Sequence, residues 1–352
     1  MIRWRSGTVT ALGPAWHGAV TLSVLVDDSS VKALAYPLLV GEPVVGDRVV
    51  LNVGAQLMGL GTGGYALVVA IPDRLPPDPL DDGTTRAAGH LVKARYTPSQ
   101  AITLGVDEEA SPHRALFEDD DLAGAVVVVA DLHSALPAIL AGVHRDAPDA
   151  RVAYVMTDGG ALPAWFSRTL DGLRGVLAGT VTVGQAFGGD LEATTVHSGL
   201  LAARHVLRAD VTVVAQGPGN LGTGTRWGFS GVAAGEAVNA AAILGGRPVA
   251  SLRVSAADAR PRHRGVSHHS RTAYGRVALA PADIPVPDGL DLDLGGLGTR
   301  HRIVKVTVDG LDAALRESPV PLSTMGRGLD ADHAYFLTAA AAGRHAAALL
   351  HP

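Results

Sequence analysis

The stretch Val211-Thr-Val-Val-Ala215 is typical of a buried strand, and it leads into the loop Gln216-Gly-Pro-Gly-Asn-Leu-Gly-Thr-Gly-Thr-Arg-Trp-Gly228. A helix of small residues is predicted from about Phe229. Glycines let backbone N–H groups approach a ligand, and a helix N-terminus contributes about half a positive charge. Strand, loop and helix together therefore predict a site for an anionic group.

The same strand belongs to a series in which apolar runs alternate with helical patterns. The predicted strands are Ala125–Ala130, Arg151–Met156, Thr180–Val183, Val211–Ala215, Val249–Val254 and Ile303–Val308. The predicted helices are Ser134–Arg145, Pro163–Leu173, Leu191–Leu207, Phe229–Leu244 and Asp330–Leu350. Continuous apolar strands joined by crossover helices are typical of a parallel sheet. We predict an α/β fold with a mainly parallel sheet and crossover helices on both faces.

The N-terminal part follows a different pattern. Short apolar or alternating segments separated by turn signals predict strands at Ser6–Leu12, Ala19–Val26, Ser30–Tyr36, Arg48–Asn52 and Tyr65–Ala70. We expect a small β-barrel-like domain over residues 1–71, a Pro/Asp-rich linker over 72–89 and the α/β domain over 90–352. One or two further strands are expected in His90–Leu104.

Composition excludes several classes of protein. The 352 residues are 47% apolar and 18% charged, with 4% aromatic residues, so we expect a core packed through small side chains. A net charge of −5 argues against nucleic acid as a partner, and the absence of cysteine excludes disulfides and thiolate chemistry. No apolar run is long enough for a membrane helix, and no signal-type run follows Met1–Ser6. We expect a cytoplasmic protein that does not bind membranes; the sequence leaves homo-oligomers open.

Polar residues follow the predicted strands where a ligand is expected, because open parallel sheets bind ligands at the carboxyl ends of their strands. The candidates for acid–base or metal chemistry are Asp131, His133, Asp158 and Asp190. Carboxylates and imidazoles bind Mg²⁺, Mn²⁺ or Zn²⁺. No metal-binding spacing is present, and aspartates at strand ends also cap helices. The sequence thus admits a divalent metal without requiring one.

The glycine loop and a basic segment, Arg260–Arg271, are the candidates for anion binding. The expected ligand-binding residues are Gly217, Gly219, Gly222, Thr223, Gly224, Thr225, Arg262, Arg264, His268 and His269. The loop matches G-x-G-x-x-G only weakly, since it follows the fourth strand of the series, and no P-loop lysine is present. A nicotinamide dinucleotide is therefore disfavoured. A wide packing turn and a solvated basic loop are the structural alternatives.

Several segments resemble a known bacterial family. Met156-Thr-Asp-Gly-Gly-Ala-Leu-Pro163, Gly184-Gln-Ala-Phe-Gly-Gly-Asp-Leu-Glu-Ala193, the Gly217–Gly231 loop and Gly265-Val-Ser-His-His-Ser270 together resemble domain of unknown function 3866. The resemblance extends over nearly the whole chain. It implies a bacterial cytoplasmic protein and assigns no activity, so no catalytic residue is inherited from it.

The leading hypothesis is binding of a phosphorylated or nucleotide-like small molecule, with turnover left open. One alternative is a non-catalytic regulatory or scaffold protein that uses the barrel to bind a partner. Another is a metal-dependent hydrolase. The hydrolase hypothesis requires that at least three of the following residues lie in one coordination sphere: Asp131, His133, Asp158, Asp190, His197, His268 and His269. His268 and His269 would point to opposite faces if they lay on a strand.

Overall fold

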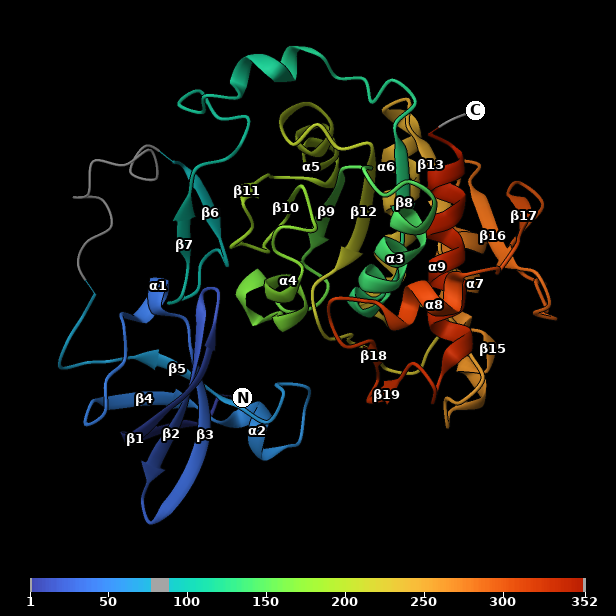
Figure 1. The fold of residues 1–352 in the computed structure, drawn as a ribbon. Coiled ribbons are helices and arrows are strands. Elements are labelled where there is room, and N and C mark those ends of the chain that lie inside the picture. The colour runs from blue at the N-terminus through green and yellow to red at the C-terminus, as the bar shows by residue number, and fades with distance from the viewer. Residues whose placement is uncertain (1, 77–88, 351–352) are drawn as a thin grey trace. The chain divides into compact units, whose positions relative to one another are not determined.

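The computed structural model describes residues 2–76 and 89–350, and the chain divides into two compact units, residues 1–104 and 105–352 (Figure 1). Most of the predicted linker, residues 77–88, lies outside the described residues. Within the described ranges, no helix has the length and apolar character required to cross a bilayer.

The first unit contains a closed five-stranded barrel, as predicted. Its strands are β1 (Trp4–Trp16), β2 (Ala19–Val26), β3 (Ser29–Ala35), β4 (Arg48–Asn52) and β5 (Ala66–Ala70). They pair in the order β1-β2-β3-β5-β4, and β4 closes on β1. The interior is filled by buried aliphatic side chains such as Leu22, Val24 and Leu51, which alternate with outward residues because a strand has a two-residue period.

Short elements complete this unit. They are the helices α1 (Pro37–Val40) and α2 (Gly54–Leu57) and the strands β6 (Leu91–Lys93) and β7 (Ala101–Thr103). β6 and β7 form an antiparallel hairpin, which confirms the strands predicted in His90–Leu104.

The second unit is built on an eight-stranded parallel sheet. Its strands are β8 (Val126–Val129), β9 (Val152–Thr157), β10 (Gly179–Thr182), β11 (Leu191–Glu192), β12 (Val211–Gln216), β13 (Arg247–Ala250), β16 (Asp283–Pro287) and β17 (Arg302–Val306). The spatial order is β11-β10-β9-β12-β8-β13-β16-β17, and every neighbouring pair is parallel. The predicted parallel sheet is confirmed.

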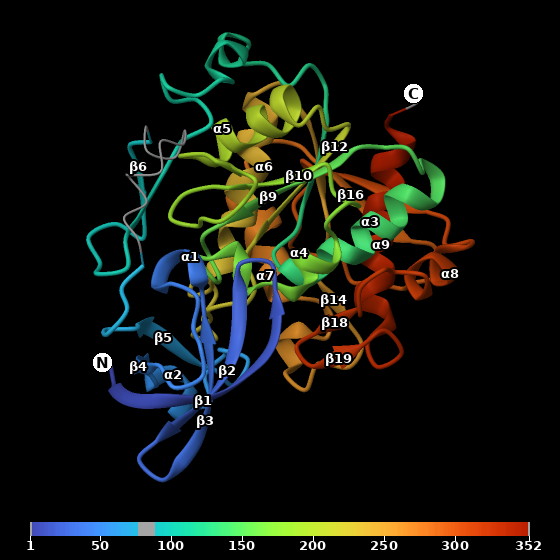
Figure 2. The ribbon, with the colours of Figure 1, turned by 60° about the vertical axis from the view of Figure 1, so that its left-hand side comes forward.

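Helices cover both faces of the sheet, also as predicted (Figure 2). One face packs against α3 (Leu136–Asp146), α4 (Arg168–Gly172), α8 (Leu311–Arg316) and α9 (His333–Ala348). The other packs against α5 (Val196–Leu201), α6 (Ala233–Ile243) and the π-helical turn Ala273–Val277 that follows α7 (His268–Thr272). Alternate residues of each strand enter alternate cores, so strands in the middle of the sheet are apolar on both faces.

Three predicted elements are divided in the structure. Within the helix predicted over Pro163–Leu173, a 3₁₀ turn covers Ala164–Phe166 and α4 begins only at Arg168. Leu191 and Glu192 form the short edge strand β11, and the helix predicted over Leu191–Leu207 begins only at Val196. The strand predicted over Val249–Val254 ends at Ala250. The chain then enters β14 (Val254–Ser255), which pairs antiparallel with β15 (Gly265–Val266). A second small hairpin joins β18 (Ser323–Thr324) and β19 (Arg327–Gly328).

Candidate functional site

The connections of the sheet change sides between two neighbouring strands, β8 and β12. The helix after β8 is α3, which packs on one face, whereas α6, after β12, packs on the other. Adjacent parallel strands with connections on opposite faces open a crevice at their carboxyl ends, where α/β proteins bind ligands. Asp131 follows β8 and the glycine loop follows β12, so these two predicted features meet at the switch point of the sheet.

Asp131 is the buried acid at this switch point, with 3% of its surface exposed. Its Oδ2 lies 3.8 Å from Arg253 Nη1 and 3.6 Å from His269 Nδ1, and makes no hydrogen bond within the described residues. Gln216 Nε2 donates to the Asp131 carbonyl oxygen at 2.9 Å. Gln216 Oε1 is likewise buried, with no hydrogen-bond partner in the described chain. Two such acceptors at one switch point make it the candidate site.

The enclosed space beside Asp131 is small. A cavity of about 10 Å³ is lined by residues of β8 and β12, Thr157, Ser230 and Gly231. This volume accommodates about one water molecule. The cavity is therefore too small for a ligand larger than water.

A network of arginines and aspartates extends from Asp131 along the chain that follows β13. Its ion pairs are Arg253–Asp131, Arg253–Asp258 (3.9 Å), Arg260–Asp258 (2.9 Å), Arg327–Asp258 (3.4 Å) and Arg327–Asp332 (2.9 Å). Hydrogen bonds from the Arg260 side chain are the main cause that holds the pKa of Asp258 far below its usual range. Because three cations face three anions, the network carries no net charge.

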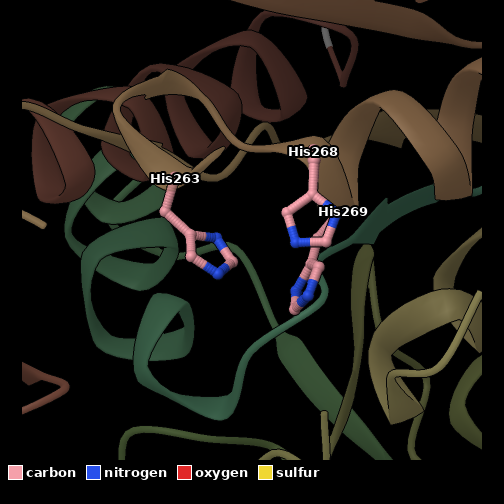
Figure 3. A group of neighbouring side chains, drawn as sticks. All are labelled: His263, His268 and His269. Carbon is pink, nitrogen blue, oxygen red and sulfur yellow. The ribbon is translucent and has the colours of Figure 1, made fainter. Parts of the chain in front are cut away.

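Three histidines meet beside this network. His263 ends the turn Pro261–His263, and His268 and His269 open α7. The ring centroids lie 4.4–4.9 Å apart, and Figure 3 shows the rings around a common space. The Phe229 ring stacks on His269 at 3.7 Å. Successive side chains of a helix differ in direction by about 100°, so His268 and His269 both reach this space, unlike neighbours on a strand.

Ser267 fixes the positions of two of these histidines. Its fully buried hydroxyl lies 2.8 Å from His263 Nδ1 and accepts a hydrogen bond from the His269 backbone N–H as the N-cap of α7. Burial is the main cause that lowers the pKa of His263 to about 3 and that of His268 to about 4. Neighbouring positive charges lower both pKa values further. Both rings are therefore neutral at pH 7 and retain a basic nitrogen.

The glycine loop is a short hairpin rather than an open cradle of N–H groups. Gly222 forms an antiparallel β-bridge with Phe229. The Thr223 N–H donates to the Gly228 carbonyl oxygen at 2.7 Å, and the Ser230 N–H donates to the Leu221 carbonyl oxygen. The tip, residues 223–227, is exposed and carries the Thr223 and Thr225 hydroxyls, 3.0 Å apart. A ligand in solution can reach this tip, and Gly219, Leu221 and Gly222 before it are exposed too.

The glycines of the loop serve different purposes. Gly217 is a packing residue, because a Cβ there would overlap the Ala161 carbonyl oxygen. Gly219 and Gly224 have φ values of +92° and +82°, which favour glycine. A Cβ at Gly224 would lie 3.5 Å from Arg262 Nη2, so the tip contacts the basic segment. Arg264 is also exposed, and its Nε donates to the Asp258 carbonyl at 3.0 Å.

His133 lies in the core and not at the edge with the other candidates, which corrects the expectation that it joins them. The Tyr154 hydroxyl donates to the carbonyls of Ala215 and Gln216, so His133 Nδ1 donates to Tyr154 at 2.9 Å. His133 Nε2 then accepts from the Ser167 hydroxyl at 2.7 Å. These bonds satisfy both ring nitrogens and make His133 a structural residue.

Asp158 and Asp190 are not brought to Asp131 either. Asp158 is exposed after β9, and its Oδ2 accepts from the Gln185 N–H at 2.8 Å. Asp190 precedes β11, and the pairing of Leu191 with Val181 places it beside Thr180, whose N–H it binds at 2.8 Å. Because β10 is only four residues long, Asp190 is level with the start of that strand and not with its end.

His197 lies apart from the switch point. It is exposed at the start of α5 and lines a depression of about 370 Å³ together with Arg114, Phe117 and Glu118. None of the switch-point residues lines this depression.

Protonation of His133 is expected to destabilise the protein in acid. Burial lowers the pKa of His133 to about 4 from a value of 6.5 in the unfolded chain. The unfolded state therefore binds the proton more strongly, and stability present above pH 6.5 is lost as the pH falls to about 4. This single group accounts for about 3 kcal/mol.

Urea denaturation of the wild type and of His133→Gln between pH 7 and pH 4 measures this loss. The stability of the variant should fall less steeply over that range, whatever its stability at pH 7. Parallel pH profiles for the two proteins would contradict the assignment.

Fold and site define a class: a parallel α/β protein with a histidine- and arginine-rich switch point, carrying a five-stranded barrel in its other unit. The chain belongs to the family described as protein of unknown function (DUF3866), whose sequence model matches residues 32–343. The resemblance predicted from the sequence is thereby confirmed. No curated protein and no solved structure matches the chain. The family description assigns no activity, so function is argued from the site.

Two residues of the site were missed in the sequence. His263 was counted only as part of the basic segment, although it lies five residues before His268. Arg253 lies within the strand predicted over Val249–Val254, where it is a charged residue in a largely apolar run near the carboxyl end of the strand. A charge in such a run predicts a buried ion pair, and this signal could have identified it.

Proposed function

We propose that the protein binds a small anionic molecule of the phosphorylated or nucleotide-like class between the hairpin tip, residues 223–227, and the basic segment, residues 260–271. The observation that carries this proposal is the state of Arg262. Its side chain is exposed and lies beside Gly224, and within the described residues it forms no hydrogen bond or ion pair. Other arginines nearby, Arg260 and Arg327, are already paired with carboxylates. A guanidinium group binds phosphate or carboxylate by two parallel hydrogen bonds.

The surroundings of Arg262 supply further polar groups. The Thr223 and Thr225 hydroxyls are at the hairpin tip, and Arg264 is exposed on the same segment. His268 is half-buried, and the positive charge of Arg262 helps to lower its pKa. His269 contributes less to ligand binding, since Phe229 covers one face of its ring. Together these groups favour an anion whose phosphate is bound by side chains more than by the loop backbone.

The proposal concerns binding and not acid–base catalysis by the predicted acidic set. The Asp158 and Asp190 carboxylates accept hydrogen bonds from the Gln185 and Thr180 N–H groups, and both nitrogens of His133 are occupied by core hydrogen bonds. The use of the barrel to recruit a partner remains a prediction.

Removal of the Arg262 guanidinium is expected to weaken anion binding. Thermal-shift measurements with ATP, pyrophosphate and glucose 6-phosphate, in EDTA, would first identify a stabilising probe. A ligand at 100 times its Kd stabilises the fold by roughly 2.7 kcal/mol. Arg262→Ala should then weaken binding of that probe by about 10- to 100-fold, because charged hydrogen bonds contribute about 1.5–3 kcal/mol.

The control is Arg174→Ala, which removes an exposed arginine before β10, at the amino ends of the strands. Gly222→Val tests the loop itself. A Cβ there has no neighbour closer than 3.8 Å, so the variant should fold normally. The added valine side chain crowds the adjoining hairpin tip and should weaken binding of the probe. The proposal fails if no probe binds the wild type, if Arg262→Ala and Gly222→Val both bind the probe normally, or if Arg174→Ala causes an equal loss.

A further inference from the structure

We propose that His263, His268 and His269 together bind one divalent transition-metal ion, such as Zn²⁺. This site goes beyond the anion-binding proposal and does not depend on it. One nitrogen from each ring lies within 4.8 Å of the others. Nitrogens that share a Zn²⁺ ion at about 2.1 Å are about 3.4 Å apart in tetrahedral geometry. Small rotations of the rings suffice to close this difference.

The ring nitrogens are available for a metal. His263 uses Nδ1 for the Ser267 hydroxyl, which leaves its Nε2 for coordination. His268 Nε2 is buried and has no hydrogen-bond partner among the described residues. A buried imidazole nitrogen without a partner is costly in an ordinary core, and a metal ion removes that cost.

Asp131 and Ser267 provide the outer groups that metal-binding histidines require. Metal sites commonly hold the second nitrogen of each histidine by a carboxylate, carbonyl or hydroxyl group. Ser267 does this for His263, and Asp131 Oδ2 lies 3.6 Å from His269 Nδ1 with no hydrogen bond of its own within the described chain. Arg253 Nη1 now donates to His269 Nδ1 at 3.2 Å, so the ring proton is on Nε2. When a metal takes Nε2, the ring changes tautomer, and Nδ1–H can donate to the unsatisfied Asp131 oxygen in place of the Arg253 hydrogen bond.

The nearby Arg253 does not exclude a cation. Its guanidinium lies 3.2 Å from His269 Nδ1, but it is paired with the buried carboxylates of Asp131 and Asp258. Of the arginines whose charges act on His268, Arg253 and Arg260 are paired with carboxylates, and Arg262 is exposed to solvent, which screens its charge.

The ligand set selects the kind of metal. Imidazole nitrogens suit Zn²⁺, Co²⁺ and Ni²⁺, whereas Mg²⁺ and Ca²⁺ require oxygen ligands. Three protein ligands leave a fourth position for water or substrate, the pattern of catalytic zinc sites. The sequence-based hypothesis required at least three of seven residues, and His263 was not among them. The proposed site takes His268 and His269 from that set and adds His263 as the third ligand.

Zinc binding by the tag-free full-length protein tests the site. After EDTA treatment and dialysis, calorimetric titration with ZnCl₂ should show one equivalent bound, and Co²⁺ should give the visible spectrum of a tetrahedral complex. His263→Ala and His268→Ala should each weaken Zn²⁺ binding by roughly 100-fold or more, and Asp131→Asn, a positioning change, by about 10-fold. His197→Ala, an exposed histidine outside the cluster, should bind as the wild type does.

X-ray absorption of the zinc-loaded wild type gives a readout that does not depend on the folding of any variant. It should count three imidazole ligands. No saturable binding, fewer than two imidazoles, or equal loss in His197→Ala would overturn the proposal and leave a packed histidine cluster. The anion-binding test is independent, because it is run in EDTA and Arg262→Ala should leave Zn²⁺ binding unchanged.

Discussion

Gly142→Ala is expected to destabilise the α/β unit by about 2–3 kcal/mol, and Gly142→Val by more, because both overpack a helix crossing. A Cβ on Gly142 of α3 would overlap the Ala340 carbonyl oxygen of α9, and a Cβ on Gly343 would overlap Ile139 in return. The two helices therefore touch backbone to backbone on one face of the sheet. The obstacle is backbone, which cannot rotate away like a side chain.

The expected destabilisation by Gly142→Ala is opposite in sign to the usual effect of this substitution in a helix. In a helix without such a contact, replacing glycine by alanine stabilises by about 1 kcal/mol. The matched control is Ala141→Gly, since Ala141 is the preceding residue of α3 and is only partly buried. That change should cost about 1 kcal/mol through helix propensity alone. Urea denaturation measures both, and a Gly142→Ala protein as stable as the wild type would show that α3 and α9 are not in backbone contact.

Arg253→Met is expected to cost about 3–5 kcal/mol, the penalty for removing one partner of a buried ion pair. Arg253 and its partners Asp131 and Asp258 are each at most 3% exposed. Arg260 and Arg327 still pair with Asp258, but Asp131 loses its guanidinium partner. The destabilisation therefore arises mainly from the Asp131 carboxylate left in a low-dielectric environment.

A second substitution separates this cause from a loss of packing. Asp131→Asn in the Arg253→Met background removes the isolated charge and should restore part of the lost stability, a coupling measured by a double-mutant cycle. Arg316→Met, which removes a half-exposed arginine from surface ion pairs, should change stability little. Additive effects of the Arg253 and Asp131 changes would contradict the buried pair.

Most of the sheet could be predicted because its strands are local features of the sequence. Runs such as Val126–Val129 and Val211–Gln216 are apolar throughout, as expected of strands buried on both faces. β11 could not be predicted, since two residues are too few to show a period and its pairing with β10 depends on a long-range contact. The break after Ala250 depends likewise on pairing between Val254 and Val266.

Less of the candidate site could be predicted. The edge of the sheet follows from the rule that ligands bind at carboxyl ends, and Asp131, the glycine loop and the basic segment do lie there. The inward position of His133 depends on Tyr154 and Ser167, which are 21 and 34 residues away. The position of Asp190 along the neighbouring strand depends on where β10 begins and ends. The apolar pattern of the sequence does not define those ends to within one residue.

The two architectures, the parallel sheet, the family and the edge at which polar residues collect were all predictable from the sequence, because periodicity and strand ends are local properties of the chain. Tertiary structure decided which of those polar residues meet. It brought His263 to His268 and His269 through the capped start of α7, and buried Arg253 against Asp131. The physical reason is that side-chain convergence depends on strand order and on the few residues that turn each loop, and neither is encoded in a local period.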